Sequence, residues 1–158
     1  MTQMIPATAE GHHKLIKELK RLREIERPKN VEDIERAREL GDLSENAEYH
    51  AAKERQSFIE GAIRDLEDKL SRIQVIDPAS INSDKVVFGA TVQLYDVDND
   101  AEVTYKIVGD FEANVSANKI SISSPLARAL IGKEEGDEVT FQSPGGKRNY
   151  EIISIEYK

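Results

Sequence analysis

The stretch from Ala52 to Ile73 reads AKERQSFIEGAIRDLEDKLSRI. Two interleaved sets of residues recur in it at heptad spacing, and all but one member are apolar: Ala52, Ile59, Leu66 and Ile73 in the first set, and Gln56, Ile63 and Leu70 in the second. Charged residues fill most of the other positions. This pattern is typical of a helix that buries one narrow face against another helix. The stretch therefore predicts one half of a two-helix coiled coil.

The segment before it, from residue 8 to about residue 40, predicts the partner helix. Thr8 is a suitable N-cap. The first apolar positions have coiled-coil spacing: Leu15, Leu19 and Leu22. Pro28 removes one backbone donor, so we expect the helix to bend there rather than end. The helical pattern resumes at Val31 and Ile34.

The connection between these two helices is very short and runs Leu40-Gly41-Asp42-Leu43-Ser44-Glu45. Gly41 suits the left-handed position that follows many helices, and a short connection makes the two helices antiparallel neighbours. A helix of roughly 33 residues is about 50 Å long at 1.5 Å per residue. Because so long a hairpin cannot curl back on itself, we expect its far end to project into solvent or into a partner.

The sequence pattern changes after Pro78 and a polar linker from Ala79 to Lys85. Period-two alternation and turn residues then predict five strands, at Val86 to Tyr95, Glu102 to Val108, Lys119 to Ser123, Val139 to Gln142 and Tyr150 to Tyr157. Leu126 to Ile131, after Pro125, predicts a short helix. The expected fold class is α+β: an N-terminal antiparallel α-helical coiled-coil hairpin over residues 1–77, and a small antiparallel β-sheet domain with one short helix over residues 78–158.

Charge argues against free nucleic acid as the partner. The 158 residues carry a net charge of −8. Residues 1–77 contain 14 basic and 17 acidic residues, and residues 78–158 contain 8 and 13. Neither half is a basic module, although phosphate neutralisation supplies most non-specific affinity for DNA. We therefore expect no independent sequence-specific DNA binding, and a protein partner wherever the chain acts near nucleic acid.

Several other classes of site are missing from the sequence. There is no Cys, which removes disulfides and Cys-based zinc sites and fits a reducing compartment. Neither a metal-binding HExxH motif nor a phosphate-binding P-loop is present. The first residues lack the apolar core of a signal peptide, and no segment is long and apolar enough to span a bilayer. We expect a cytoplasmic protein without a membrane partner.

The segment Gly41-Asp42-Leu43-Ser44-Glu45-Asn46-Ala47-Glu48-Tyr49-His50-Ala51-Ala52 resembles the coiled-coil tip of the Gre family of bacterial transcript-cleavage factors, in its GreA type. The resemblance covers essentially the whole chain in order. Its other segments are Ile5-Pro6, Arg27-Pro28, Val75-Ile76-Asp77, Phe88-Gly89-Ala90-Thr91-Val92, Ile107-Val108-Gly109 and Ser124-Pro125-Leu126-Ala127-Arg128-Ala129-Leu130-Ile131-Gly132-Lys133.

The resemblance implies a fold and a function. The C-terminal domain would have an FKBP-like fold and dock on the rim of the secondary channel of RNA polymerase, while the coiled coil passes down the channel. Its acidic tip would reach the catalytic centre of a backtracked complex, where the polymerase itself hydrolyses the extruded RNA 3′ segment and arrest is relieved. The factor, expected to be a monomer, would be no enzyme and would have no cofactor of its own. It would share Mg²⁺ with the polymerase.

Asp42 and Glu45 are the candidate catalytic and metal-binding residues. Their spacing where a helix starts can place both on the same exposed end, and Mg²⁺ prefers oxygen ligands. By the resemblance, Asp42 would coordinate the second Mg²⁺ of the polymerase and Glu45 would help to position the attacking water. The alternative is structural: Asp at the N-cap with Glu three residues later forms a capping box, which needs no further function.

Arg38, Lys53 and Tyr49 are the candidate RNA contacts near the tip. Arg38 and Lys53 resemble the small basic patch of the family, and an aromatic ring can stack on bases. Each has an alternative reading: the two cations could pair with nearby glutamates such as Glu39 or Glu54, and Tyr49 could pack across the hairpin. For Arg55 we expect only the structural role.

Residues Ser124 to Lys133 resemble the docking segment of the family. Ser124, Pro125, Arg128 and Lys133 are the candidate contacts with the polymerase. The apolar members are expected to belong to the core: Leu126, Leu130 and Ile131. The alternative is a Pro-started helix that only completes this core.

Three other functions compete with this interpretation. An inhibitor on the same scaffold could enter the same channel and block it, although Asp42 and Glu45 favour a stimulator. A peptidyl-prolyl isomerase would need an aromatic-lined pocket, and fold likeness alone carries no activity. A zinc-bearing coiled-coil regulator of the same channel would need cysteines, which the chain lacks.

Overall fold

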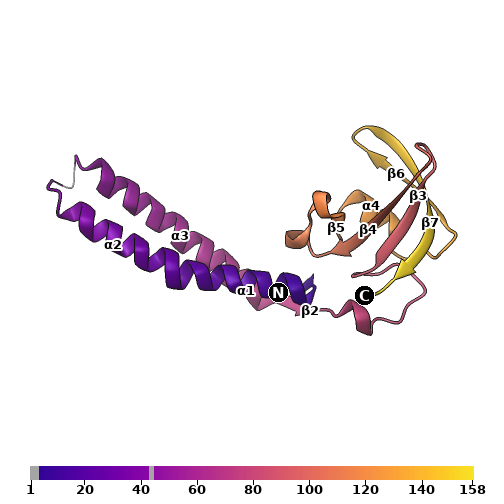
Figure 1. Cartoon of the computed structure of the whole chain (residues 1–158), viewed down its shortest axis with the longest axis horizontal. Coiled ribbons are helices and arrows are strands. Elements are labelled where there is room, and N and C mark those ends of the chain that lie inside the picture. The colour runs from indigo at the N-terminus through magenta and orange to yellow at the C-terminus, as the bar shows by residue number, and fades with distance from the viewer. Residues whose placement is uncertain (1–3, 43–44) are drawn as a thin grey trace. The chain divides into compact units, whose positions relative to one another are not determined.

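A computed structural model describes residues 4–42 and 45–158 (Figure 1). Backbone contacts divide these residues into two compact units. The helical unit contains His12–Ile73, and the C-terminal unit contains Gln74–Lys158 together with Met4–Gly11. The first described residues thus group with the C-terminal unit, whereas a division after residue 77 places them with the hairpin.

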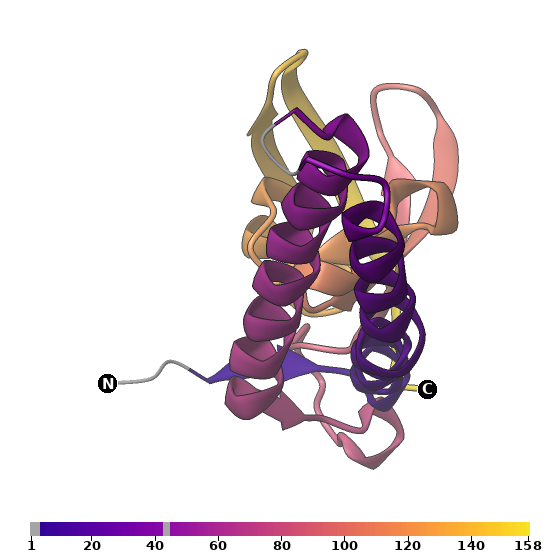
Figure 2. The same cartoon turned by 90° about the vertical axis from the view of Figure 1, so that its left-hand side faces the viewer.

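The helical unit is an antiparallel hairpin, as the heptad pattern predicts (Figure 2). Its first arm is a continuous run of three elements: α1 (Ala9–Arg21), the π-helical segment η1 (Leu22–Glu26) and α2 (Arg27–Arg38). Its second arm is α3 (Ala47–Arg72). The interruption expected at Pro28 takes the form of η1, a widened turn that ends two residues before the proline. A proline ring clashes with the carbonyl four residues earlier in a regular α-helix, and a widened turn accommodates such a residue.

The seam between the two arms is apolar near the root of the hairpin and becomes polar and small-sided towards the tip. Leu19, Leu22, Ile59 and Ile63 form a buried cluster, against which Ala62, Leu66 and Leu70 pack. Nearer the tip the buried residues are Asn30, Ile34, Ala37 and Ala52. The side-chain amide of Asn30 donates to the carbonyl of Ala52 at 3.0 Å. Val31, expected to continue the helical pattern, is 44% exposed and does not belong to the seam.

The C-terminal unit contains a five-stranded sheet in the order β5-β4-β3-β7-β6. The strands are β3 (Thr91–Asp96), β4 (Ala101–Val108), β5 (Lys119–Ser121), β6 (Glu138–Ser143) and β7 (Gly146–Glu156). The sheet is mixed rather than purely antiparallel, because β5 pairs with β4 in parallel. The strand expected from Val86 starts only at Thr91. The α+β class of the prediction is confirmed.

The core of this unit lies between the sheet and the short helix α4 (Pro125–Leu130). Its fully buried side chains include Val86, Val92, Leu94, Ile107, Leu130 and Ile152. The burial pattern of β3 alternates strictly, so that every second side chain faces this core. Three short 3₁₀ segments complete the unit: η2 (Pro78–Ser80), η3 (Asp110–Glu112) and η4 (Val115–Ala117).

A second, two-stranded sheet joins β1 (Ile5–Ala7) to β2 (Ile73–Val75). Neither strand was predicted from the sequence, because three residues are too few for a recognisable alternation. In the described part of the chain, no helix is long and apolar enough to cross a membrane.

Candidate functional site

The connection between α2 and α3 places Asp42 and Glu45 at the tip of the hairpin, at the end remote from Ile73 (Figure 1). The Leu40 amide donates to the carbonyl of Ala37 at 3.1 Å, and Gly41 then has a φ of +124°, which an L side chain rarely adopts. Gly41 has the predicted left-handed backbone, but it lies beyond the helix end, because α2 ends at Arg38 and Glu39 is its C-cap. The side chains of Asp42 and Glu45 are both exposed. Leu43 and Ser44, between them, lie outside the described residues.

Asn46 is the N-cap of α3. Its side-chain oxygen accepts a hydrogen bond from the Tyr49 amide at 3.0 Å, and its side-chain NH₂ donates to the carbonyl of Ala37 at 2.6 Å. Asn46 thus satisfies one amide at the start of α3 and one carbonyl at the end of α2. The alternative reading of Asp42 and Glu45 as a capping box is therefore wrong, because the helix begins four residues later than that reading requires.

The two tip carboxylates fit a shared metal site better than a complete one. Carboxylate oxygens are hard ligands of the kind that Mg²⁺ prefers, but Mg²⁺ takes six ligands in octahedral geometry. Within residues 4–42 and 45–158, no group of three or more carboxylate, His or Cys side chains could hold a metal ion. Asp42 and Glu45 could thus complete a site whose other ligands come from another molecule.

Arg38 and Tyr49 contact each other across the hairpin. The central guanidinium carbon of Arg38 lies 5.9 Å from the centroid of the Tyr49 ring, and the ring of His50 meets Tyr49 edge-on at 5.7 Å. The predicted packing of Tyr49 across the hairpin is confirmed. The ammonium group of Lys53 donates to Gln56 at 2.8 Å, rather than pairing with the expected Glu54. Contact of these residues with RNA stays a prediction.

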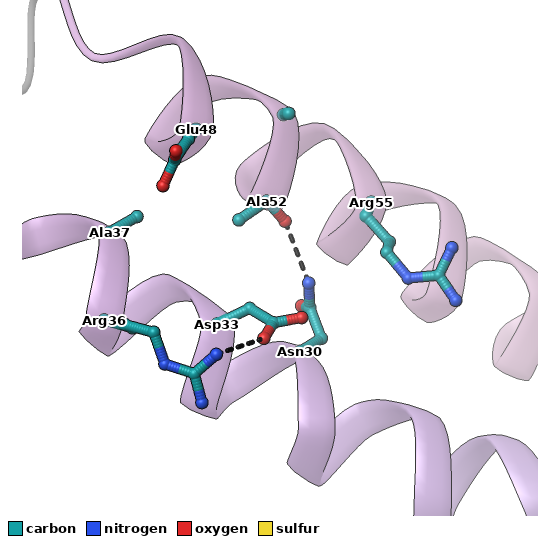
Figure 3. Close-up of a pocket in the computed structure, with 8 residues that line it drawn as sticks. Asn30, Asp33, Arg36, Ala37, Glu48, Ala52 and Arg55 are labelled. Carbon is teal, nitrogen blue, oxygen red and sulfur yellow. Dashed lines mark hydrogen bonds and ion pairs between the residues drawn. The ribbon is translucent and has the colours of Figure 1, made fainter.

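A pocket of about 340 Å³ lies behind the tip, between α2 and α3 (Figure 3). It is lined by Asn30, Asp33, Arg36, Ala37, Glu48, Ala51, Ala52 and Arg55. Three alanines keep the side chains short here, and the lining carries two acidic and two basic residues. This balance selects no single class of ligand. Sequence reasoning missed the pocket, although the small residues near the tip were a signal for loose packing.

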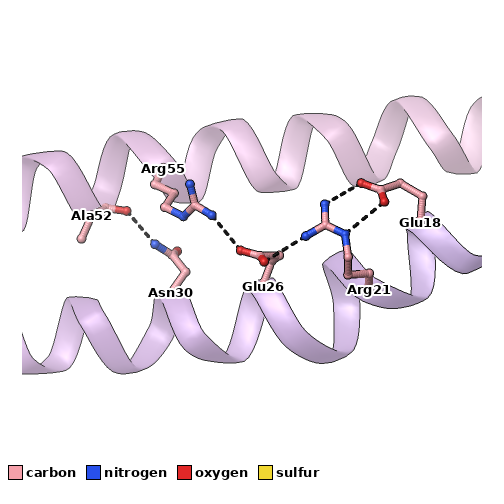
Figure 4. A network of polar contacts seen from close by, with 6 residues as sticks. All are labelled: Glu18, Arg21, Glu26, Asn30, Ala52 and Arg55. Carbon is pink, nitrogen blue, oxygen red and sulfur yellow. Dashed lines mark hydrogen bonds and ion pairs between the residues drawn. The ribbon is translucent and has the colours of Figure 1, made fainter.

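Arg55 has the structural role that the sequence analysis favoured (Figure 4). Its guanidinium donates to Glu26 at 2.7 Å, across the hairpin. Glu26 also accepts from Arg21 at 2.9 Å, and Arg21 in turn donates to Glu18. The hydrogen bond from Arg55 is the largest cause that holds the pKa of Glu26 below its ordinary value. A second pair also joins the two arms: Arg27 binds Glu60 through two hydrogen bonds of 2.8 and 2.7 Å.

The predicted docking segment begins as expected and ends differently. Ser124 caps α4 by accepting a hydrogen bond from the Ala127 amide at 3.3 Å, and Pro125 occupies the first helical position. Leu126 and Leu130 are buried, as predicted, but Ile131 is 37% exposed because the helix ends at Leu130. Arg128 and Lys133 are exposed. Their contact with the polymerase stays a prediction.

An acidic side chain lies next to this segment. Asp110 accepts hydrogen bonds from the hydroxyls of Ser121 and Ser123, the second at 2.7 Å. These bonds, with a smaller contribution from the charge of Arg128, hold the pKa of Asp110 below its ordinary value. A fixed carboxylate therefore lies within electrostatic reach of a predicted docking cation.

Comparisons with known proteins agree over both units. Residues 5–75 match the family described as transcription elongation factor, N-terminal, and residues 81–157 match the family described as transcription elongation factor, GreA/GreB, C-term. The chain is 58% identical over 154 residues to a protein of Alkalilimnicola ehrlichii named transcription elongation factor GreA, and covers 98% of it. It is 59% identical over 156 residues to the protein of the same name from Hyphomonas neptunium, and covers 99% of it.

Among solved structures, GreA factor homolog 1 (Gfh1) of Thermus thermophilus is 29% identical and matches 98% of this chain, with a TM-score of 0.45. The N-terminal and C-terminal family matches together span nearly the whole sequence, and the full-length relatives share more than half of its residues. The chain therefore belongs to the GreA/GreB family of transcription elongation factors.

Proposed function

We propose that this chain binds RNA polymerase at the rim of its secondary channel and inserts the hairpin into the channel. There it stimulates the polymerase's own Mg²⁺-dependent cleavage of backtracked RNA and so rescues arrested complexes. Family membership supports the polymerase as the partner. The observation that carries the proposal is the pair of exposed carboxylates, Asp42 and Glu45, in a short connection at the tip of the hairpin.

The helix caps on either side of the tip are other residues. Glu39 is the C-cap of α2 and Asn46 is the N-cap of α3, so Asp42 and Glu45 occupy neither cap position. A bound Mg²⁺ supplies a Lewis acid and a water of lowered pKa. Asp42 would add one oxygen ligand to that ion, and Glu45 would accept a hydrogen bond from the attacking water and hold it in line.

The side chains around the tip would guide the RNA. Arg38 and Lys53 carry positive charge on the two arms, and Tyr49 offers an aromatic ring beside Arg38. Phosphate attracts the cations, and a base can stack on the ring or on the guanidinium plane. In the C-terminal unit, Arg128 and Lys133 would contact the polymerase, while Ser124 and Pro125 fix the start of the helix that carries Arg128.

The test is RNA cleavage in an arrested elongation complex across a Mg²⁺ titration. The double variant Asp42→Asn/Glu45→Gln removes both charges while Asn46 still caps α3. We expect normal helicity and normal polymerase binding, but a loss of stimulated cleavage of at least about 100-fold. A loss of this size is typical when a metal ligand or a positioned acid–base group is removed. Glu54→Gln removes an exposed carboxylate from the same helix and serves as the control, with full activity expected.

Two results would contradict the proposal. Full activity of the double variant would show that the tip carboxylates do not act on the metal. A wild-type protein that slows elongation and blocks cleavage would identify an inhibitor on the same scaffold instead.

A further inference from the structure

Thr8, the N-cap of α1, is held in place by a residue from a distant part of the sequence. Thr8 is only 6% exposed, and its hydroxyl oxygen accepts a hydrogen bond from the Gly11 amide at 3.1 Å, as the predicted N-cap should. The Thr8 hydroxyl in turn donates to the carboxylate of Glu112, and the Thr8 amide donates to the same carboxylate at 3.2 Å. The Glu112 carboxylate therefore binds both the main-chain amide and the side-chain hydroxyl of Thr8.

The same carboxylate also fixes its own helical turn. The Gly109 amide donates to Glu112 Oε2 at 2.9 Å, and the Glu112 amide donates back to the carbonyl of Gly109 at 2.9 Å. Glu112 thus closes the start of η3 while it holds Thr8. One side chain ties together two helix starts within the C-terminal unit, and negative charge is favourable at both.

Two glycines make this approach possible because they leave space for it. A Cβ on Gly11 would lie 2.0 Å from Glu112 Oε1, and a Cβ on Gly109 would lie 2.5 Å from the carbonyl oxygen of Pro6. Neither glycine has the positive φ that would by itself require the residue. Their role here is close packing. Lys119 adds an ion pair of 3.8 Å to Glu10 on the same turn.

We propose that Glu112 is a positioning residue, which anchors the root of the first arm to the C-terminal unit and so restricts where the tip carboxylates can go. The proposal rests on the proposed function for its effect on cleavage. Residues Ala9–Gly11 of α1 belong to the C-terminal unit, while the rest of the helix belongs to the hairpin. Because α1 runs on from this first turn into the hairpin, loosening the turn would widen the range of directions that the arm can take.

The length of the arm makes a small rotation at its root matter at the tip. From Ala9 to Arg38 the first arm is about 45 Å long at 1.5 Å per residue. A rotation of about 2° at one end then moves the other end by more than about 1 Å, and a misplacement of about 1 Å can cost about 100-fold in rate. Loosening Glu112 should therefore lower cleavage although it touches neither RNA nor metal.

The experiment measures the distance between the two units in the free, full-length protein. Because the chain has no Cys, cysteines introduced at the exposed Ser57 and Gln142 can carry one spin label each. We expect Glu112→Ala to broaden the distribution of label-to-label distances and to lower stimulated cleavage by about 10-fold or more. Glu112→Gln keeps the size and most of the hydrogen bonds, so it should restore most of both. Glu138→Ala, an exposed glutamate in the same unit, is the control and should leave both unchanged.

A second pair of variants tests the contact directly and does not depend on how Glu112→Ala folds. Ala is a better helix former than Gly, so Gly11→Ala should not destabilise the protein if no other side chain lies against that position. With Glu112 in place the new methyl group displaces the carboxylate, and we expect the distance distribution to broaden and cleavage to fall. In the double variant Gly11→Ala/Glu112→Ala the clash is gone, so its effect should be no larger than that of Glu112→Ala alone.

The outcomes separate this proposal from the proposed function. If Glu112→Ala and Gly11→Ala leave the distance distribution like that of Glu138→Ala, Glu112 does not anchor the arm, whatever cleavage shows. If the distribution broadens but cleavage is unchanged in an active wild-type background, Glu112 does not position the tip. An inactive wild type would contradict the proposed function, while the distances would still decide on the anchor.

Discussion

Arg55 of α3 donates a hydrogen bond to Glu26 of η1 at 2.7 Å, and so joins the two arms at the widened turn. Glu26 is the better shielded partner, with 18% of its side chain exposed against 56% for Arg55. The pair stands in a row of alternating charges that includes Arg21 and Glu18. Within this row the Arg55–Glu26 bond crosses between the arms, at a level between the apolar cluster of Leu19, Leu22, Ile59 and Ile63 and the bond from Asn30 to Ala52.

The first prediction concerns pH. The pKa values of Glu18, Glu26 and Glu60 lie below the ordinary value of 4.5, each chiefly because of a hydrogen bond from an arginine. A carboxyl group whose pKa is lower in the folded state stabilises that state above its unfolded pKa, and the contribution is lost as the pH falls through the folded pKa. We therefore expect the unfolding temperature of the hairpin to decrease as the pH is lowered beyond about 4.5. Thermal unfolding followed by circular dichroism measures this.

The control for this prediction is Arg55→Gln, which removes the main cause of the lowered pKa of Glu26. The variant should unfold at a lower temperature at neutral pH and lose less on acidification than the wild type. Added salt should weaken the pH dependence, because exposed ion pairs are screened. An unfolding temperature that rises on acidification would contradict the assignment.

The second prediction concerns Asn46, which caps α3 and holds the end of α2. Asn46→Ala removes both hydrogen bonds and should lower the free energy of unfolding by about 1–2 kcal/mol, since loss of an N-cap alone costs about 1 kcal/mol. Asn46→Asp keeps the acceptor for Tyr49 but loses the donor to Ala37, so it should lie between Ala and the wild type. Denaturant unfolding measures the series, with Asp42→Ala as the matched control. Equal losses from Asp42→Ala and Asn46→Ala would show that Asp42 contributes to the cap as much as Asn46 does.

The third prediction separates the two roles of Tyr49. Tyr49→Phe keeps the aromatic face under Arg38 and should preserve both stability and cleavage. Tyr49→Ala should lower stability by about 0.5–1 kcal/mol, the size of an exposed cation–π contact. Arg38→Gln removes the same contact from its other side and is the comparison. If the ring also stacks on RNA, Tyr49→Ala should reduce cleavage more than Arg38→Gln does, even where the two variants lose the same stability. Cleavage and unfolding measured on the same preparations decide between the roles.

The fourth prediction concerns docking. Arg128→Ala changes an exposed side chain of α4 and Lys133→Ala an exposed side chain three residues after it, so both should leave the unfolding temperature within about 1 °C of wild type. Binding to polymerase should weaken, and it should respond less steeply to salt than wild-type binding does. Lys147→Ala, at an exposed turn position, is the control. If both docking variants bind polymerase with unchanged affinity, the docking surface does not include Arg128 or Lys133.

Local sequence patterns were sufficient for the hairpin. The heptad positions Ile59 and Ile63 are buried as predicted, because helical periodicity determines which residues share a face. The start of α3 was harder, since Asp42 and Asn46 are both good caps four residues apart. Tyr49 at the third helical position gives no capping-box signal, and it is the bonds of Asn46 with the Tyr49 amide and with Ala37 across the hairpin that identify Asn46 as the cap.

Long-range contacts account for what the sequence did not predict. Thr8 was recognised as a cap, but its partner Glu112 lies 104 residues away and carries no pattern that points to Thr8. The parallel pairing of β5 with β4 depends on how the chain between them folds, through η3 and η4, and three residues do not reveal a strand direction. Ile131 looked like core because of its side chain, yet α4 ends one residue before it.

The widened turn η1 gives the first arm one residue more than a regular helix of the same length would need. Deleting a single residue between Leu22 and Glu26 would restore ordinary α-helical winding. Because the widened turn absorbs that extra residue, Ile34 and Ala37 would stay in the seam. A single deletion elsewhere in the first arm would turn the residues beyond it by about 100°, the angle between successive helical residues. Homologues should accordingly tolerate a one-residue change in length at η1 better than at other places along this arm.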